Sequence, residues 1–86
     1  ISTSQLNKYF GEWVEKFPPP LYKNRRVKVN YITQVSTAPP TFVIYANIPE
    51  GIHFSYERYL QNQIRETFTF EGVPVRFRFR KKGKEK

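Results

Sequence analysis

The chain has 86 residues, 17% of them aromatic, and its 15 Lys and Arg against 7 Asp and Glu give a net charge of +8. This length predicts a single domain with a modest core, and the positive excess favours a polyanionic partner such as RNA, or an anionic membrane surface. Cysteine is absent and no apolar run nears the roughly 20 residues that cross a bilayer, which argues against disulfides, thiolate zinc sites and a transmembrane helix.

Residues 4–17 are predicted to form the first helix, because apolar side chains recur along one helical face. That face comprises Leu6, Phe10, Trp13, Val14 and Phe17. Thr3 or Ser4 can cap its start. A run of three prolines beginning at Pro18 must end it, since proline lacks the amide proton that a helix needs.

Two strands are predicted next, at residues 26–35 and 41–48. Alternation in the first separates a mainly apolar face (Val27, Val29, Tyr31, Thr33, Val35) from a mainly polar one (Arg26, Lys28, Asn30, Ile32, Gln34). The first of these faces should therefore be buried. The second strand is apolar on both faces, so Ile32 with Val43 or Tyr45 should form an apolar patch on any face that the helices leave open. Such a patch usually marks a protein contact.

A second helix is predicted from Ser55, as its cap, to Phe68, with a buried stripe of Tyr56, Tyr59, Leu60, Ile64 and Phe68. A third strand follows, in which Val75, Phe77 and Phe79 alternate with Arg76, Arg78 and Arg80. The order α-β-β-α-β predicts an α+β fold with a three-stranded sheet and both helices on one face. Residues 1–80 should form the domain, and residues 81–86 a disordered basic tail.

Positive charge gathers in two clusters, which are the candidate phosphate-binding residues. One comprises Lys23, Arg25, Arg26 and Lys28, and the other Arg76, Arg78, Arg80, Lys81, Lys82 and Lys84. Between them, residues 29–75 carry a net charge of minus two. For the last five residues, a purely solubilising role is an equally good interpretation.

The chain has few of the side chains that enzymes use for catalysis. The chain has no Asp and no Cys, and its single histidine, His53, lies in a predicted loop without a partner to orient it. The seven glutamates are scattered, and the four glycines are too far apart for a phosphate-binding loop. We therefore expect a domain without an active site and without a metal site.

Several runs of residues resemble one known family. They are Thr3-Ser4-x-Leu6-Asn7, the prolines at 18–20, Lys28-x-x-Tyr31-Ile32-Thr33-Gln34, Pro39-Pro40-Thr41-Phe42-Val43, Asn47, Ser55-Tyr56-x-Arg58-Tyr59-Leu60-x-Asn62-x-Ile64-Arg65-Glu66 and Phe70-x-Gly72-x-Pro74. Together they resemble the C-terminal KH-like domain of EngA (Der), a family of bacterial GTPases with two tandem G domains. The chain also lacks methionine and begins at Ile1, which favours a domain cut from a longer protein over simple removal of an initiator methionine.

The resemblance implies a cytoplasmic protein that assists assembly of the large (50S) ribosomal subunit. GTP and Mg²⁺ would belong to the G domains, and this chain would hold no cofactor. Its implied partners are 23S rRNA in the large subunit and the parent protein's own G domains, with no membrane involved, and the isolated domain should be monomeric. Packing on the G domains, so as to sense their nucleotide state, is the alternative function.

One departure from ordinary KH domains changes the expected mode of binding. KH domains clamp a nucleic-acid backbone with a Gly-x-x-Gly loop, and no two glycines here have that spacing. The two basic clusters should then carry RNA binding. Candidate residues for a domain interface are Ile32, Gln34, Pro39, Pro40, Val43, Tyr45, Arg58 and Asn62. For Arg58 and Asn62, local bonding to the segment around Gln34 is an equal alternative, and the two prolines can also serve as a rigid turn.

Overall fold

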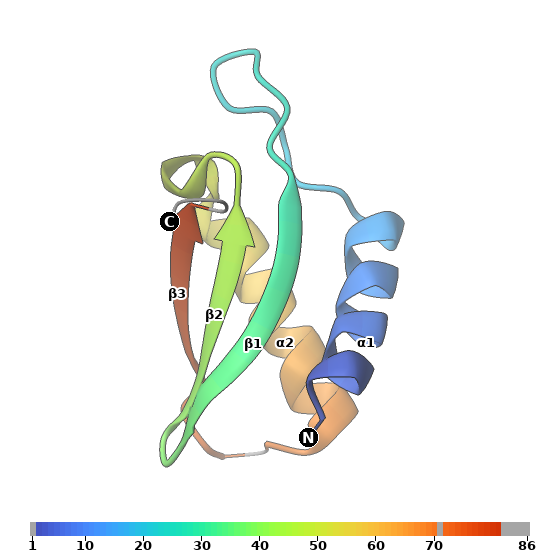
Figure 1. Cartoon of the computed structure of the whole chain (residues 1–86), viewed down its shortest axis with the longest axis vertical. Coiled ribbons are helices and arrows are strands. Elements are labelled where there is room, and N and C mark those ends of the chain that lie inside the picture. The colour runs from blue at the N-terminus through green and yellow to red at the C-terminus, as the bar shows by residue number, and fades with distance from the viewer. Residues whose placement is uncertain (1, 71, 82–86) are drawn as a thin grey trace.

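The computed structural model describes residues 2–70 and 72–81, which form two helices packed against a three-stranded sheet (Figure 1). In chain order the elements are α1 (Thr3–Lys16), β1 (Val29–Thr37), β2 (Pro40–Ala46), a single 3₁₀ turn η1 (Pro49–Gly51), α2 (Phe54–Phe68) and β3 (Arg76–Lys81). The predicted order α-β-β-α-β and the α+β class are confirmed.

β2 is the central strand of the sheet, in the order β1-β2-β3. It pairs antiparallel with β1 and parallel with β3, so the direction of β3, which the sequence left open, is that of β2. The core lies on one face, where Leu6 and Phe10 of α1 meet Phe42 and Ile44 of β2 and Leu60 of α2. The other face of the sheet is open, and we call it the open face.

The caps of both helices lie one or two residues before the predicted ones. Ser2, rather than Thr3 or Ser4, caps α1 by accepting a 3.1 Å hydrogen bond from the Gln5 amide. The cap of α2 is His53, whose Nδ1 accepts from the Ser55 amide at 3.1 Å, so the prediction of Ser55 as the cap is wrong. His53, for which the sequence offered no partner, therefore has a structural role as the cap of α2.

The predicted buried stripes are confirmed with one exception. Leu6, Phe10 and Trp13 of α1 are buried, as are Tyr56, Leu60 and Ile64 of α2, while Val14, Tyr59 and Phe68 pack partly buried around them. Phe17 is 55% exposed, because α1 ends at Lys16 and the chain leaves the helix there. Its ring keeps an edge contact with Tyr59, at 5.4 Å between centroids, and Lys16 Nζ lies 5.9 Å from its centroid.

The facing of β1 was predicted wrongly for Tyr31, Ile32 and Val35. Ile32 is fully buried in the core, whereas Tyr31 and Val35 are 42% and 58% exposed. The cause is an irregularity of the pairing with β2 between Val29 and Tyr31, where the register shifts. A bulge adds one residue to the strand and so exchanges the two faces beyond it. Ile32 therefore cannot take part in an apolar patch on the open face.

The edge of β1 is covered at the same residue. The Asn7 side chain, on α1, receives a 2.9 Å hydrogen bond from the Ile32 amide and donates one of 2.8 Å to the Ile32 carbonyl. It donates a third, of 2.9 Å, to the Thr3 carbonyl within its own helix. An amide side chain thereby replaces a neighbouring strand at this point, which satisfies backbone groups that an edge strand would otherwise expose.

Candidate nucleic-acid interface

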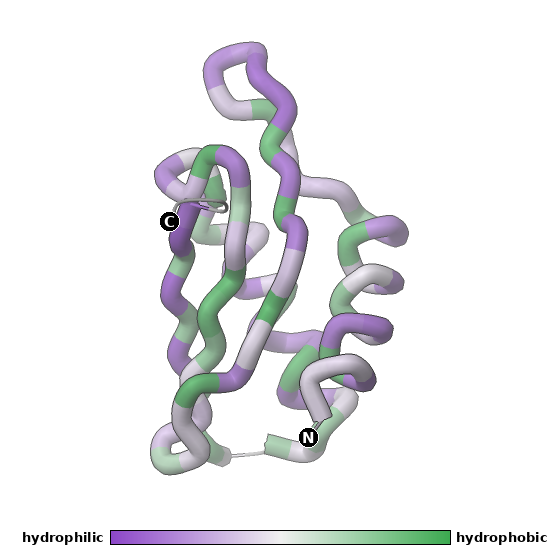
Figure 2. The backbone as a smooth tube through the Cα atoms, in the orientation of Figure 1, coloured by the Kyte–Doolittle hydropathy of each residue, from purple (hydrophilic) through white to green (hydrophobic). Residues whose placement is uncertain are grey.

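The segment from Tyr22 to Lys28, which we call the basic loop, projects beyond the sheet between α1 and β1 (Figure 1). Its tip is a tight turn in which Tyr22 and Arg25 exchange two backbone hydrogen bonds of 2.9 Å. Lys23 and Asn24 both have positive φ, of 50° and 64°, as the type I′ hairpin turn requires. The turn thus fixes the backbone at the tip of the basic loop. In Figure 2 the projecting segment is largely hydrophilic.

Asn47, which follows β2, holds the base of the basic loop. Its Oδ1 accepts a hydrogen bond of 2.7 Å from the Lys28 amide, and its Nδ2 donates one of 3.0 Å to the Arg26 carbonyl. Its own amide donates to the Lys28 carbonyl at 3.1 Å. Three bonds from one residue bring order to a segment that has no helix or strand of its own.

A second anchor lies at η1. Gly51 is buried against the Tyr22 ring so closely that a Cβ at this position would approach Tyr22 Cγ to 2.8 Å. Only glycine fits there without a shift of the ring. The loop is thereby held at Tyr22 on one side and at Arg26 and Lys28 on the other.

The C-terminal end of α1, just before the proline segment that leads into the basic loop, is tied to α2. The Tyr59 hydroxyl donates to the Trp13 carbonyl at 2.8 Å, and the Tyr56 hydroxyl donates to the Phe17 carbonyl at 2.7 Å. The Trp13 carbonyl also accepts from the Phe17 amide at 3.1 Å, whereas the Phe17 carbonyl lies past the last turn of α1 and takes its hydrogen bond from Tyr56. Burial raises the pKa of the Tyr56 phenol well above its usual range, with a contribution from Tyr59, and burial also raises the pKa of Tyr59.

The three arginines of the second basic cluster lie on the open face. Arg76, Arg78 and Arg80 are exposed on β3, whereas Val75 is buried and Phe77 and Phe79 turn toward the core, as predicted. Figure 2 shows the corresponding alternation of hydrophilic and hydrophobic residues along β3. Lys81 still belongs to the strand, so the expected tail begins no earlier than residue 82. Lys82 and Lys84 lie outside the described residues.

Each arginine has a neighbour on β2 in the pairing register. Arg76 is opposite Thr41, Arg78 opposite Val43 and Arg80 opposite Tyr45. On the other side of β2, Tyr45 pairs with Tyr31, and the two rings lie 6.1 Å apart with an angle of 40° between their planes. Paired residues point to the same face of a sheet, so an aromatic pair sits beside the arginines on the open face.

Comparison with known proteins agrees with this architecture. The family model for the KH-domain-like C-terminal region of EngA bacterial GTPase enzymes matches residues 1–80. The chain belongs to this family. Curated relatives named GTPase Der include that of Geobacter metallireducens, which is 58% identical over 80 residues and covers 93% of this chain. That of Moorella thermoacetica is 51% identical over 86 residues, or the whole of this chain. The chain spans about a fifth of the length of these relatives, 18% and 19% respectively.

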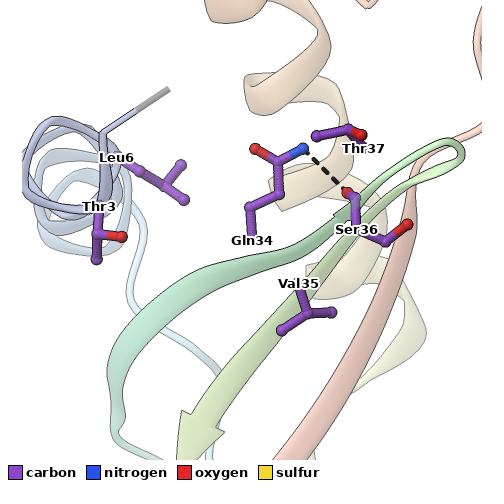
Figure 3. Close-up of a pocket in the computed structure, with 6 residues that line it drawn as sticks. All are labelled: Thr3, Leu6, Gln34, Val35, Ser36 and Thr37. Atoms are coloured by element: carbon purple, nitrogen blue, oxygen red, sulfur yellow. Dashed lines mark hydrogen bonds between the residues drawn. The ribbon is translucent and has the colours of Figure 1, made fainter.

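The remaining predicted interface residues of this KH-like domain do not form one surface. Pro40 is buried at the start of β2 and Pro39 is exposed in the turn before it. Gln34 donates to the Ser36 carbonyl at 3.1 Å, beside a shallow groove of about 520 Å³ between β1 and the start of α1 (Figure 3). Arg58 and Asn62 are exposed on α2, and among the described residues no hydrogen bond joins them to the segment around Gln34.

Two absences concern the described part of this EngA-family domain. Within residues 2–70 and 72–81 there is no group of three or more His, Asp or Glu side chains that could hold a metal ion. Over the same residues, no helix has the length and apolar character needed to cross a membrane. What the described surface does offer is cationic side chains, at the basic loop and on the open face.

Sequence reasoning missed three features of the candidate interface. These are the tight turn at Lys23 and Asn24, the role of Asn47, and the exposure of Tyr31. Type I′ turns are usually signalled by Asn-Gly or Asp-Gly, and Lys-Asn gives no such signal. For Asn47 the only available signal was a short polar residue directly after an apolar strand, a common feature of turns.

Proposed function

We propose that this KH-like domain docks its parent GTPase onto structured RNA of the large ribosomal subunit and has no catalytic role itself. The observation that supports this best is that β3 ends, at Arg80 and Lys81, on the side of the sheet from which the basic loop projects. Val29, which directly follows the basic loop, pairs with Ala46, and Ala46 pairs with Lys81 at the end of β3. Neighbouring strands lie about 5 Å apart, so the basic loop and the Arg80–Lys81 end of β3, with β2 between them, can contact one stretch of RNA.

No acidic residue lies within either stretch of basic residues in the sequence. Residues 23–28 and 76–81 contain four basic residues each and no Asp or Glu. Contacts from such side chains to phosphates release counterions, so they give affinity that falls steeply with salt and depends little on base sequence. A domain that positions a large enzyme on folded RNA needs this kind of contact more than it needs sequence readout.

The parent protein supplies the context of the proposal. The relatives are named as GTPases and are about five times as long as this chain, so the nucleotide and Mg²⁺ sites would lie in the remainder of such a protein. A cytoplasmic location and 23S rRNA as the contacted molecule belong to the same proposal.

Binding of the chain to purified large subunits, and to 23S rRNA fragments, across a range of salt concentrations would test the proposal. The informative variant is Arg78→Gln/Arg80→Gln, and its matched control is Lys8→Gln/Lys16→Gln, which removes the same charge from exposed positions on α1. The arginine variant should lower the slope of log affinity against log salt by about 0.7–0.9 for each phosphate that is no longer neutralised. An equal effect of both variants would mean that only net charge matters.

A second candidate function is an intramolecular one, in which the open face packs on a G domain and reports its nucleotide state. The observation in its favour is the exposure of Tyr31 and of Val35, which is 58% exposed, on an edge strand. Sensing would require that the surface bind one nucleotide state of the G domain more tightly than the other. Titration of the isotope-labelled chain with each G domain, loaded with GDP or a GTP analogue, would show shifts at these two residues if the function holds.

A further inference from the structure

The open face carries a row of side chains that spans all three strands. Tyr31 on β1, Tyr45 on β2 and Arg80 on β3 are direct neighbours in the pairing register. The next row along the strands is Thr33, Val43 and Arg78. Val43 is only 6% exposed, so it forms an apolar floor beside the two rings.

The geometry of this row leaves aromatic surface accessible from solvent. The Tyr31 and Tyr45 rings are 6.1 Å apart and inclined by 40°, so they are neighbours that do not stack face to face. Tyr31 is 42% exposed and Tyr45 is half-buried. The phenol hydroxyls are absent from the hydrogen bonds within the described residues, in contrast to those of Tyr56 and Tyr59, which bind carbonyls of the α1 segment.

The charge around the rings favours an anionic occupant. The two rows together contain two arginines and no acidic residue, and Arg76 continues the series beside Thr41. Arginines on one side and rings on the other are the combination with which proteins hold unpaired nucleotides, because every base has a face that can stack and every nucleotide carries a phosphate. Paired RNA cannot use the rings in this way, since its bases are already stacked inside the helix.

We propose that the open face is a binding site for unpaired nucleotides of RNA. One base stacks on Tyr31 and its neighbour contacts Tyr45, while Arg78 and Arg80 bind the adjoining phosphates. This inference rests on the proposed RNA-docking function and makes it more specific. The basic loop supplies contacts to backbone phosphates, and the open face requires a base that is free to leave its helix.

The test separates base stacking from charge. Fluorescence anisotropy would measure binding of the full chain to a labelled ten-nucleotide oligoadenylate and to an abasic ribose-phosphate oligomer of the same length. Stacking predicts tighter binding of the oligoadenylate. Base–aromatic contacts lose roughly tenfold in affinity when the ring is removed, so Tyr31→Leu should weaken oligoadenylate binding by about that factor and leave the abasic oligomer unaffected. Tyr31→Phe, which keeps the ring, should bind as the unaltered chain does.

Phe54→Leu is the matched control. Phe54 is a 67% exposed ring at the start of α2, outside the open face, so its loss should leave both affinities unchanged. Equal affinity for the two oligomers, or equal weakening by Tyr31→Leu and Phe54→Leu, would overturn the stacking site. The RNA-docking proposal would survive either result as long as salt-dependent binding to the large subunit persisted. If Tyr31→Leu weakened binding to an isolated G domain and had no effect on oligoadenylate, the occupant would be protein and the inference wrong.

Discussion

Replacement of Asn47 by alanine tests whether the order of the basic loop matters for binding. The change removes the 2.7 Å hydrogen bond from the Lys28 amide and the 3.0 Å bond to the Arg26 carbonyl, while the donor of the third bond, the Asn47 backbone amide, is kept. A hydrogen bond contributes about 1 kcal/mol net to stability. Because both bonds lie near the surface, we expect Asn47→Ala to lower the free energy of unfolding by about 1–2 kcal/mol, or the melting temperature by roughly 5–15 °C.

Amide hydrogen exchange gives the most direct measurement. In Asn47→Ala the Lys28 amide should lose its protection, whereas amides of β2 should change only by the global loss of stability. Asn47→Asp is an informative second variant, because it keeps the acceptor for the Lys28 amide and loses the donor to the Arg26 carbonyl. Asn30→Ala, an exposed asparagine on β1, serves as the control and should leave the Lys28 amide protected.

The effect on RNA binding should differ from that of removing charge. Asn47→Ala retains all four basic residues of the loop, so the slope of log affinity against log salt should stay the same. The affinity itself should fall by roughly 3- to 10-fold, because a loosened loop must be ordered again on binding. If Lys28 lost its protection and the affinity stayed constant, loop order would be irrelevant and only its charge would count.

Three further predictions concern stability. Asn7→Ala removes the two hydrogen bonds that cover the edge of β1 at Ile32, and it should lower the free energy of unfolding, measured in urea, by about 2 kcal/mol. Asn7→Asp keeps the acceptor for the Ile32 amide and loses the donor to the Ile32 carbonyl, so it should lower the free energy of unfolding by less. Thr69, the C-cap of α2, has a φ of 61°, a backbone conformation that is unfavourable for β-branched residues. Thr69→Gly should therefore raise the melting temperature by about 4–8 °C, and an unchanged melting temperature would show that Thr69 is not strained. Tyr56 has a raised pKa, so the folded state holds its phenol proton more tightly than the unfolded state does, and stability should fall as the pH rises above about 10. In Tyr56→Phe the free energy of unfolding should fall less steeply with pH in this alkaline range. An unchanged fall would mean that Tyr56 is not its source.

Much of the fold follows from periodicity along the chain. The stripes of α1 and α2, the apolar character of β2 on both faces and the alternation of arginine with phenylalanine in β3 are all local patterns. A helix repeats every 3.6 residues and a strand every two, so these patterns identify element type and buried face without knowledge of any partner. The composition likewise pointed to a cationic binding domain.

The composition of the candidate interface depended on contacts between distant residues. Asn47 is 19 residues from Lys28, and Asn7 is 25 residues from Ile32, and neither pair is marked by any local pattern. The facing of β1 was reversed by one bulge, because a single extra residue exchanges the two sides of every position that follows. That exchange buried Ile32 and exposed Tyr31.

The sequence by itself thus determined which elements form, in what order, and where the positive charge lies. The tertiary structure alone decided which strand edge β3 joins and in which direction, how the basic loop is held, and that two tyrosine rings stand beside the arginines on the open face. The physical reason is that secondary structure depends on spacing within one segment. A binding surface depends on the register between segments, which is set only when strands pair and side chains reach across the fold.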